Sequence, residues 1–111
     1  MTKPMRGDVW LVDVGYAAEV RPALVLSVAT DGDERVLTTV VLHTTSVRNT
    51  RFESASDVRW LKEGAFDAQG ISTFSTVKLI KRLGVLPANQ LTSVEKCDCE
   101  WLGLSTQLPD G

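Results

Sequence analysis

An arginine stands directly before a proline at the start of an apolar run, in the stretch VRPALVLS. The planar guanidinium of arginine matches two phosphate oxygens and stays charged at any relevant pH. Pro22 restricts Arg21 to extended conformations, so the direction of the side chain is set before a ligand binds. Phosphate binding is therefore one interpretation of Arg21, and a surface ion pair at the end of a strand is the plainer alternative.

A second group of polar residues closes the stretch VVLHTTS and continues beyond it. Side chains alternate along a strand, so His43 and Thr45 share one face. Ser46, Arg48 and Arg51 follow within a few residues and add a hydroxyl and two positive charges. Such a cluster could bind RNA, although hydroxyls are also common in ordinary turns. His43 is the lone histidine, and it could act as an acid or base near neutral pH or simply pack at the strand end.

Cleavage of RNA is chemistry that such residues can support without a cofactor. RNA carries its own nucleophile, the 2′-hydroxyl. A protein must then remove one proton, stabilise charge on the phosphate oxygens and protonate the leaving 5′-oxygen. Arginine suits the second task, and neither a metal nor a cofactor is expected. Among the three tryptophans, Trp60 lies beside Arg59 and Lys62 and is the candidate for stacking on bases.

Length and composition place these residues in a small globular protein. The 111 residues suit a single domain, residues 1–111. A net charge of −2 argues against a general nucleic-acid coat but not against one basic cleft. Cys97 and Cys99 are expected to be two reduced thiols on a helix. No apolar run suits a membrane span, and MTKPMRGDVW lacks a signal-peptide pattern, which favours a cytoplasmic location.

Periodicity predicts five or six strands and a C-terminal helix. Alternating or β-branched runs predict strands over residues 6–15, 22–29, 35–46 and 71–80, and a weak edge strand over 52–60. The near-continuous apolar run ALVLSVA predicts a strand covered on both faces. Residues 61–70 contain two glycines and are expected to form a loop, and residues 81–86 to extend the last strand past a bend at Gly84.

The helix is expected to follow Pro87 and to run to about residue 104. Its N-cap would be Asn89 or a capping box from Thr92 to Glu95. Trp101 falls in the apolar stripe and is expected in the core, and the last seven residues are expected to fray. Strands joined by short turns favour a mainly β fold, a small antiparallel barrel with the helix packed on its surface.

Three stretches in order resemble the MazF/PemK/Kid family of toxin endoribonucleases: RGDVWLVDVG, RPALVLS and VVLHTTS. The similarity covers about residues 6–104, including the closing LGL. It implies an SH3-like barrel with a helix, a homodimer and inhibition by a cognate antitoxin. It also implies metal-independent cleavage of single-stranded RNA that leaves a 2′,3′-cyclic phosphate and a 5′-hydroxyl.

Carried across by position, the family's essential arginine and threonine fall on Arg21 and Thr45, and its neighbouring serine on Ser46. Thr45 would hydrogen-bond the phosphate or the 2′-hydroxyl. Glu19 is the acidic residue of a shortened loop, YAAEV, and a candidate for substrate binding that does not align cleanly with the family's glutamate. His43 occupies the family's usual proline position.

A further departure concerns the acid of the Kid type. Those members carry an R-x-D-Q segment in a later strand, where this chain has STFSTVK, with Thr73 and Ser75. Because this aspartate is missing, one alternative is that the protein is a catalytically weakened member of the family. A gyrase-binding toxin of the same fold, like CcdB, is the other alternative.

Overall fold

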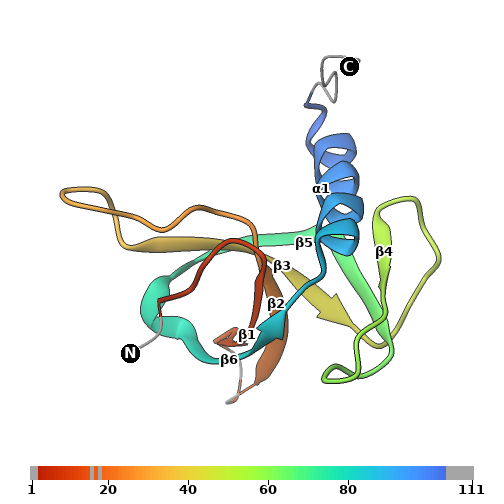
Figure 1. Ribbon diagram of the computed structural model, residues 1–111, viewed down its shortest axis with the longest axis horizontal. Helices are drawn as coiled ribbons and strands as arrows, with labels where there is room; N and C mark the ends of the chain where they lie inside the picture. Colours follow the sequence, from red (N-terminus) through yellow and green to blue (C-terminus); the bar gives the residue numbers. More distant parts are fainter. Residues whose placement is uncertain (1–2, 16, 18, 105–111) are drawn as a thin grey trace.

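The computed structural model describes residues 3–15, 17 and 19–104 of the 111-residue chain. Within them, six strands precede one α-helix, and a short 3₁₀ helix, η1 (Thr76–Lys78), joins the last two strands (Figure 1). The strands are β1 (Asp8–Asp13), β2 (Val20–Val25), β3 (Leu37–Thr44), β4 (Glu53–Ser56), β5 (Gly64–Ser75) and β6 (Leu79–Val85). The helix is α1 (Ala88–Leu102). The prediction of a mainly β fold with a C-terminal helix is confirmed.

All six strands belong to one sheet in the order β4-β5-β3-β2-β1-β6. Every neighbouring pair is antiparallel. Among the described residues β4 and β6 are the edges, so the sheet curves without closing, and the predicted barrel describes it loosely. β2 lies inside the sheet, and its register places Ala23 opposite Leu42 of β3. Consequently the start of β2 lies near the end of β3.

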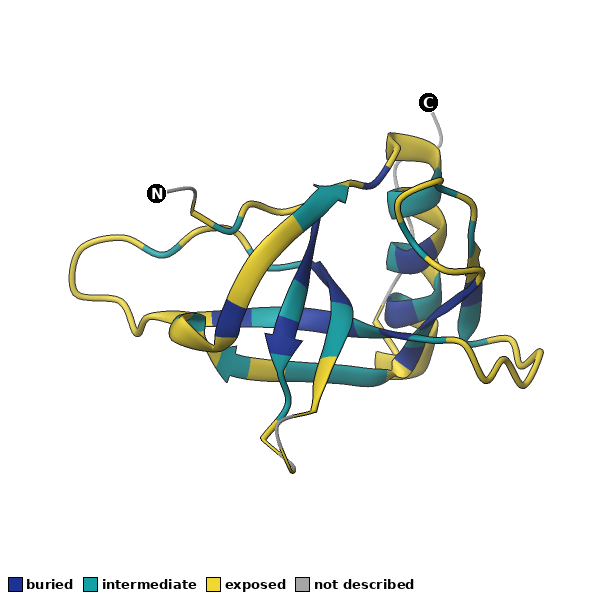
Figure 2. Ribbon diagram, turned by 90° about the horizontal axis from the view of Figure 1, so that it is seen from below, coloured by how far each residue is buried: buried dark blue, intermediate teal, exposed yellow. Residues whose placement is uncertain are grey.

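Both faces of the sheet are covered where β2 crosses it. Ala23, Leu24 and Val25 are fully buried, which confirms the prediction from the apolar run (Figure 2). Leu24 packs in a cluster that includes Val94 of α1, and its neighbours pack in a second cluster with Trp10. Burial of this kind contributes roughly 1.5–3 kcal/mol for each large apolar side chain. Because this part of β2 is buried, the backbone of Arg21, directly before Pro22, is held in place.

The loop predicted over residues 61–70 is wrong beyond Glu63, because β5 begins at Gly64 and runs through Gly70 to Ser75. Gly64 is in the strand for a packing reason. A Cβ there would overlap the backbone oxygen of Thr44 and lie 2.8 Å from His43 Cε1. The glycine thus marks a close approach of β5 to β3 rather than a turn.

The helix begins and packs differently from the predictions. Its N-cap is Pro87, with no side-chain hydrogen bond, so neither Asn89 nor the Thr92–Glu95 box caps it. Gly103, with φ 69°, ends it in the left-handed conformation that glycine adopts readily. Trp101 is 42% exposed and meets the edge of Phe52 instead of entering the core.

The helix also carries the two cysteines, which are free thiols as expected. Burial raises the pKa of Cys97, and the neighbouring carboxylates of Asp98 and Glu100 add to the effect. No helix among the described residues has the length and apolar character that crossing a membrane requires. The predicted fraying of residues 105–111 falls outside the described residues.

Asp98 is the unusual residue of α1. It is 6% exposed, and neither carboxylate oxygen has a hydrogen-bond partner among the described residues. Burial raises the pKa of Asp98 to about 6. A buried carboxylate without donors is costly when ionised, so this position opposes the stability of the fold above that pH.

Candidate functional site

An open cavity of about 510 Å³ lies where β2 begins and β3 ends. The loop between β4 and β5, residues 57–63, forms another wall, and β6 adds one leucine. Polar, basic, aromatic and aliphatic side chains share the lining, which consists of Arg21, Pro22, His43, Thr44, Thr45, Trp60, Leu61, Lys62 and Leu83.

The structure thus brings together Arg21, His43, Thr45 and Trp60 from the sequence-based candidates. The aliphatic lining residues escaped prediction because they carry no chemical signal, and Thr44 because strict alternation placed it on the other face. Lys62 is the second cation of the cavity. Its position beside Trp60 in the sequence was the signal that could have found it.

The guanidinium of Arg21 is held without being neutralised. Its Nη2 donates a hydrogen bond to the backbone oxygen of His43, with a donor–acceptor distance of 2.7 Å. Among the residues that the structure describes, Arg21 takes part in no ion pair. The surface ion pair, the plainer interpretation of this arginine, is therefore not what the structure contains. As far as residues 3–15, 17 and 19–104 show, the group has no counter-charge and keeps several N–H donors free at the wall of the cavity.

His43 is 3% exposed and is fixed by two contacts of its ring. Nε2 lies 3.0 Å from the hydroxyl oxygen of Ser56, and the ring meets Phe66 edge-to-face at 5.2 Å. The Ser56 hydroxyl donates its single proton to the backbone oxygen of Gly64, 3.2 Å away. With the Ser56 proton assigned in this way, Nε2 is the donor to Ser56, and the neutral ring carries its proton on Nε2 and leaves Nδ1 as an acceptor.

Electrostatics favour that neutral form. Burial lowers the pKa of His43, and the positive charge of Arg21 lowers it further. Near pH 7 the imidazole is therefore mostly in its neutral form, which has no proton on Nδ1 to donate. What the residue does provide is position, because its backbone oxygen binds Arg21 while its ring anchors the end of β3 to β4 and β5.

Hydroxyl groups lie beside the arginine at the end of β3. Thr45 is exposed and lines the cavity together with Thr44. The backbone N–H of Ser46 donates to Oγ1 of Thr44 over 3.0 Å, which fixes the turn after the strand. Ser46 itself does not line the cavity. Of the two predicted hydroxyls, only that of Thr45 is thus placed to reach a ligand bound near Arg21.

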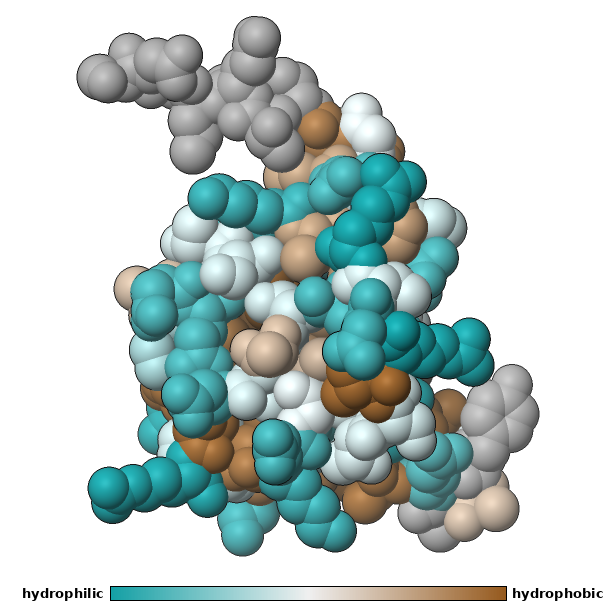
Figure 3. Space-filling view, turned by 90° about the vertical axis from the view of Figure 1, so that its right-hand side faces the viewer, coloured by the Kyte–Doolittle hydropathy of each residue, from teal (hydrophilic) through white to brown (hydrophobic). Residues whose placement is uncertain are grey.

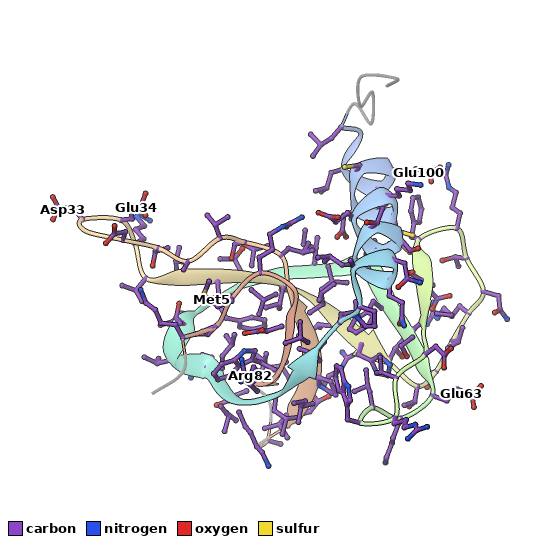
Figure 4. The ribbon with its side chains drawn as sticks, in the orientation of Figure 1. Met5, Asp33, Glu34, Glu63, Arg82 and Glu100 are labelled. Atoms are coloured by element: carbon purple, nitrogen blue, oxygen red, sulfur yellow. The ribbon has the colours of Figure 1, made fainter. Side chains whose placement is uncertain are left out.

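The predicted basic cluster after Thr45 is divided by the fold. Arg51 forms an ion pair with Glu100 of α1, 2.9 Å away, and lies over the ring of Phe52. Figure 4 shows Glu100 on the side of α1 that faces this loop. Arg48 is exposed, and its backbone N–H binds the Glu53 carboxylate. Neither arginine lines the cavity.

The Glu53 carboxylate organises the loop that carries Arg48. It accepts hydrogen bonds from the backbone N–H groups of Arg48 and Thr50, and such bonds lower the pKa of Glu53. The surrounding face, seen from the right of Figure 1, is mostly hydrophilic with small separate hydrophobic areas (Figure 3). These residues therefore form a solvated loop outside the cavity.

Glu19 and the later-strand hydroxyls also lie outside the cavity. The backbone oxygen of Glu19 accepts a hydrogen bond from Val14, and its side chain is exposed. The Thr73 hydroxyl pairs with that of Thr39 over 2.7 Å. Within residues 3–15, 17 and 19–104, no group of three or more His, Cys, Asp or Glu side chains gathers where it could hold a metal ion.

Solved structures resemble this fold closely. An endoribonuclease in complex with its cognate antitoxin, from a mycobacterial species, superposes with a TM-score of 0.80 at 24% identity, over 92% of this chain and 97% of that one. MazF in a MazE–MazF crystal structure from Deinococcus radiodurans gives 0.81 at 23% identity, over 95% and 100%. Toxin MazF-mt6 of Mycobacterium tuberculosis gives 0.76 at 21%, over 88% and 98%.

Likeness at these identities shows the fold alone. No match was found among curated proteins. Residues 5–102, however, match the family described as the PemK-like, MazF-like toxin of type II toxin–antitoxin systems. The match covers nearly the whole chain and includes every residue that lines the cavity. The chain therefore belongs to the PemK/MazF-like toxin family of type II toxin–antitoxin systems.

Proposed function

We propose that this toxin is an endoribonuclease that cleaves single-stranded RNA in the cavity between β2, β3 and the β4–β5 loop. The observation that carries the proposal is the meeting of an un-neutralised Arg21 with the hydroxyl-bearing Thr45 at one open cavity. Membership of a toxin family that includes endoribonucleases supports it. The cavity has room for a nucleotide and has cations on two sides, Arg21 and Lys62.

The reaction is an internal transesterification. The 2′-hydroxyl gives up its proton as its oxygen attacks the neighbouring phosphorus and forms a P–O2′ bond. The P–O5′ bond breaks and the 5′-oxygen takes up a proton, so that one proton passes overall from the 2′-oxygen to the 5′-oxygen. The products are a 2′,3′-cyclic phosphate and a 5′-hydroxyl. Arg21 stabilises negative charge on the non-bridging oxygens, because its free N–H donors match two of them. Thr45 hydrogen-bonds the same phosphate or the attacking hydroxyl.

The other lining residues bind and position. His43 is a positioning residue, since its backbone oxygen directs Arg21 and its buried ring fixes that oxygen. Lys62 attracts a flanking phosphate, and Trp60 offers an aromatic surface to a base. Ser46, Arg48, Arg51 and Glu19 are left out of this site, because the first three form or follow the turn after β3 and Glu19 faces solvent.

A cognate antitoxin is the proposed protein partner. Two of the similar structures are described as complexes with an antitoxin or with MazE. A disordered segment with acidic and apolar side chains fits a cavity that holds Arg21, Lys62 and Trp60. Such a segment should compete with RNA, so an uncleavable RNA in excess should slow its association.

A homodimer is proposed as well, with residues around the edge strand β6 as its interface. Val77 and Ile80 are exposed by 81% and 57%, beside a second open cavity of about 610 Å³ that Trp10 and Val36 also line. Exposed apolar groups that gather in this way are typical of interaction surfaces. Ile80→Asp should shift the sedimentation coefficient of the purified protein to that of a monomer, while Val28→Asp, which changes an exposed valine outside that cavity, should not.

Cleavage in the presence of EDTA tests the enzymatic proposal. Purified protein and a long single-stranded RNA are mixed, and the new ends are mapped by sequencing and by their chemistry. We expect cyclic phosphate and 5′-hydroxyl ends at a restricted set of sequences. Arrest of growth by a protein that leaves RNA intact would favour a gyrase-binding toxin instead.

A further inference from the structure

Trp60 lies against Gly84, although 24 residues separate them in the sequence. A Cβ built at Gly84 would come within 2.5 Å of Cε2, 2.7 Å of Cζ2 and 2.8 Å of Cδ2 of the indole. Cδ2 and Cε2 form the bond shared by the two rings, so Gly84 faces the plane of the indole rather than its edge. Any larger residue at position 84 would displace the ring.

The backbone of β6 is irregular at this place. Val9 of β1 pairs with Gly84, while the next residue, Trp10, pairs with Arg82, so Leu83 is an extra residue in β6. Bulges of this kind redirect side chains and are typical of strand edges and sites. Leu83 lines the cavity next to Trp60. The bulge and the absence of a side chain at Gly84 together leave a surface of β6 against which the indole packs.

Part of the indole that Gly84 does not cover is left for a ligand. Trp60 is 37% exposed and lines the cavity that holds Arg21 and Thr45. Glu63, at the end of the same loop, points its side chain away from the molecule (Figure 4). An aromatic ring that is supported on one face and open on the other binds a nucleobase by stacking.

We propose that Gly84 seats the Trp60 indole against β6 so that its free face stacks on one base of the RNA, beside the phosphate that Arg21 binds. The inference rests on the proposed function and deepens it by naming the subsite and the residue that shapes it. Trp60 contacts substrate in this account, and Gly84 is a positioning residue that acts through Trp60. The subsite accepts a base by its π-face, so it fixes position along the strand more than base identity.

The test measures binding with an RNA oligonucleotide that spans a mapped cleavage site and carries a 2′-deoxynucleotide at the cleaved position. Trp60→Ala should weaken binding about 5- to 150-fold, the range for one stacked base. It should raise the KM for the cleavable RNA with little change in kcat. Trp60→Phe should restore part of the affinity, and Val85→Ala, next to Gly84 but outside the cavity lining, should bind like the parent chain.

A double-mutant cycle distinguishes a role of Gly84 in positioning Trp60 from a general role of Gly84 in folding. Gly84→Ala should weaken binding in the parent chain but have no further effect in a Trp60→Ala background. Equal losses in both backgrounds would overturn the role of Gly84. Thermal unfolding of each variant shows which proteins are folded. If Gly84→Ala folds only in the Trp60→Ala background, the indole is what the added methyl group meets, and failure to fold in both backgrounds would overturn the role of Gly84.

Abasic substitution locates the stacked base. Removing one base at a time from the oligonucleotide should reveal one position, next to the cleaved phosphate, whose loss weakens binding to the parent chain and not to Trp60→Ala. Unchanged binding by Trp60→Ala, with cleavage intact in the parent chain, would overturn this proposal alone. A parent chain that neither binds nor cuts RNA would overturn the proposed function as well.

Discussion

Arg21 and Arg51 are both candidates for contact with RNA on sequence grounds, and the fold treats them in opposite ways. Arg21 is held by a backbone oxygen and keeps its full charge at an open cavity. Arg51 is paired with Glu100 and stacked on Phe52, at the base of a solvated loop. The comparison teaches that the partner of an arginine, more than its presence in a basic stretch, decides whether it can bind a phosphate.

The same contrast separates two of the buried titratable groups, His43 and Asp98. His43 has a hydrogen-bond partner, and Arg21 and burial together keep it neutral. Asp98 has no hydrogen-bond partner in the described part of the chain, and burial alone raises its pKa. The imidazole of His43 therefore has its hydrogen bond within the fold, whereas Asp98 is a buried carboxylate without a donor among the described residues.

The largest effect is expected from Arg21→Ala. It removes the charged donor group assigned to the non-bridging phosphate oxygens, and loss of one such donor typically reduces the rate about 10²- to 10³-fold. Comparison of kcat/KM with the parent chain measures this loss. Arg21→Lys should recover only a small part, because lysine is a point charge without the fork geometry. Parent-like cleavage by Arg21→Ala would remove the site assignment.

Asp98→Asn should stabilise the folded protein near neutral pH. The folded pKa, about 6, exceeds the ordinary 3.8, so folded Asp98 retains its proton over a pH range where the unfolded chain has lost it. The free energy of unfolding of the parent chain should therefore fall as pH rises from 3.8 to about 6 and stay low above that. The total is on the order of 2 to 3 kcal/mol.

Denaturant unfolding of both proteins between pH 4 and pH 8 provides the measurement. The asparagine variant should lose this part of the pH dependence and be the more stable protein at pH 7. Equal slopes in the two proteins would mean that Asp98 finds donors in solution.

Ser56→Ala tests the support of His43 and should have a smaller effect. It leaves Nε2–H of His43 without its acceptor, and such a loss costs about 1 kcal/mol of unfolding free energy. Because His43 positions Arg21, we expect a several-fold decrease in kcat with little change in KM. Ser54→Ala, a change on the same strand outside the cavity lining, serves as the matched control. Identical kcat values for the two variants would argue against the positioning role.

The His43 pKa also predicts a pH effect of known sign. The pKa of His43 in the folded chain lies below the ordinary 6.5. As pH falls below 6.5, His43 therefore takes up a proton in the unfolded chain before it does so in the folded chain. This group therefore lowers the free energy of unfolding as the solution becomes acidic. His43→Gln should remove that contribution, and a parent and variant with the same acid dependence would contradict it.

The smallest effect is expected from Arg51→Ala. Exposed ion pairs contribute at most about 1 kcal/mol, and the residue lies outside the cavity. Cleavage should change less than about threefold, since the charge removed is already compensated by Glu100. A loss comparable to that of Arg21→Ala would show that RNA extends across the helix side of the molecule.

Local patterns in the sequence were sufficient to predict most strands, whereas the expectation that Arg21 and Thr45 act together came from the family resemblance. Alternation and the apolar run specify β1, β2 and β3, and antiparallel pairing of β2 with β3 places the start of one beside the end of the other. The resemblance in three ordered stretches singled out the same two residues.

Contacts between distant segments could not be read in this way. Gly64 resembles a loop residue until β3 is seen to approach it, and Glu100 is 49 residues from the arginine that it neutralises. The Trp60–Gly84 contact depends on a bulge in β6, which leaves no local signature. Each of these contacts depends on how distant segments pack in the complete fold.

Substitution of a single 2′-hydroxyl in the RNA tests the central claim most directly. An oligonucleotide with a mapped site, in EDTA, is compared with the same strand carrying a 2′-deoxynucleotide at the cleaved position. If the RNA supplies the nucleophile and Arg21 stabilises the phosphate, the first is cut and the second is bound but stays intact. Cleavage of the deoxy-substituted strand at the same bond would contradict the account.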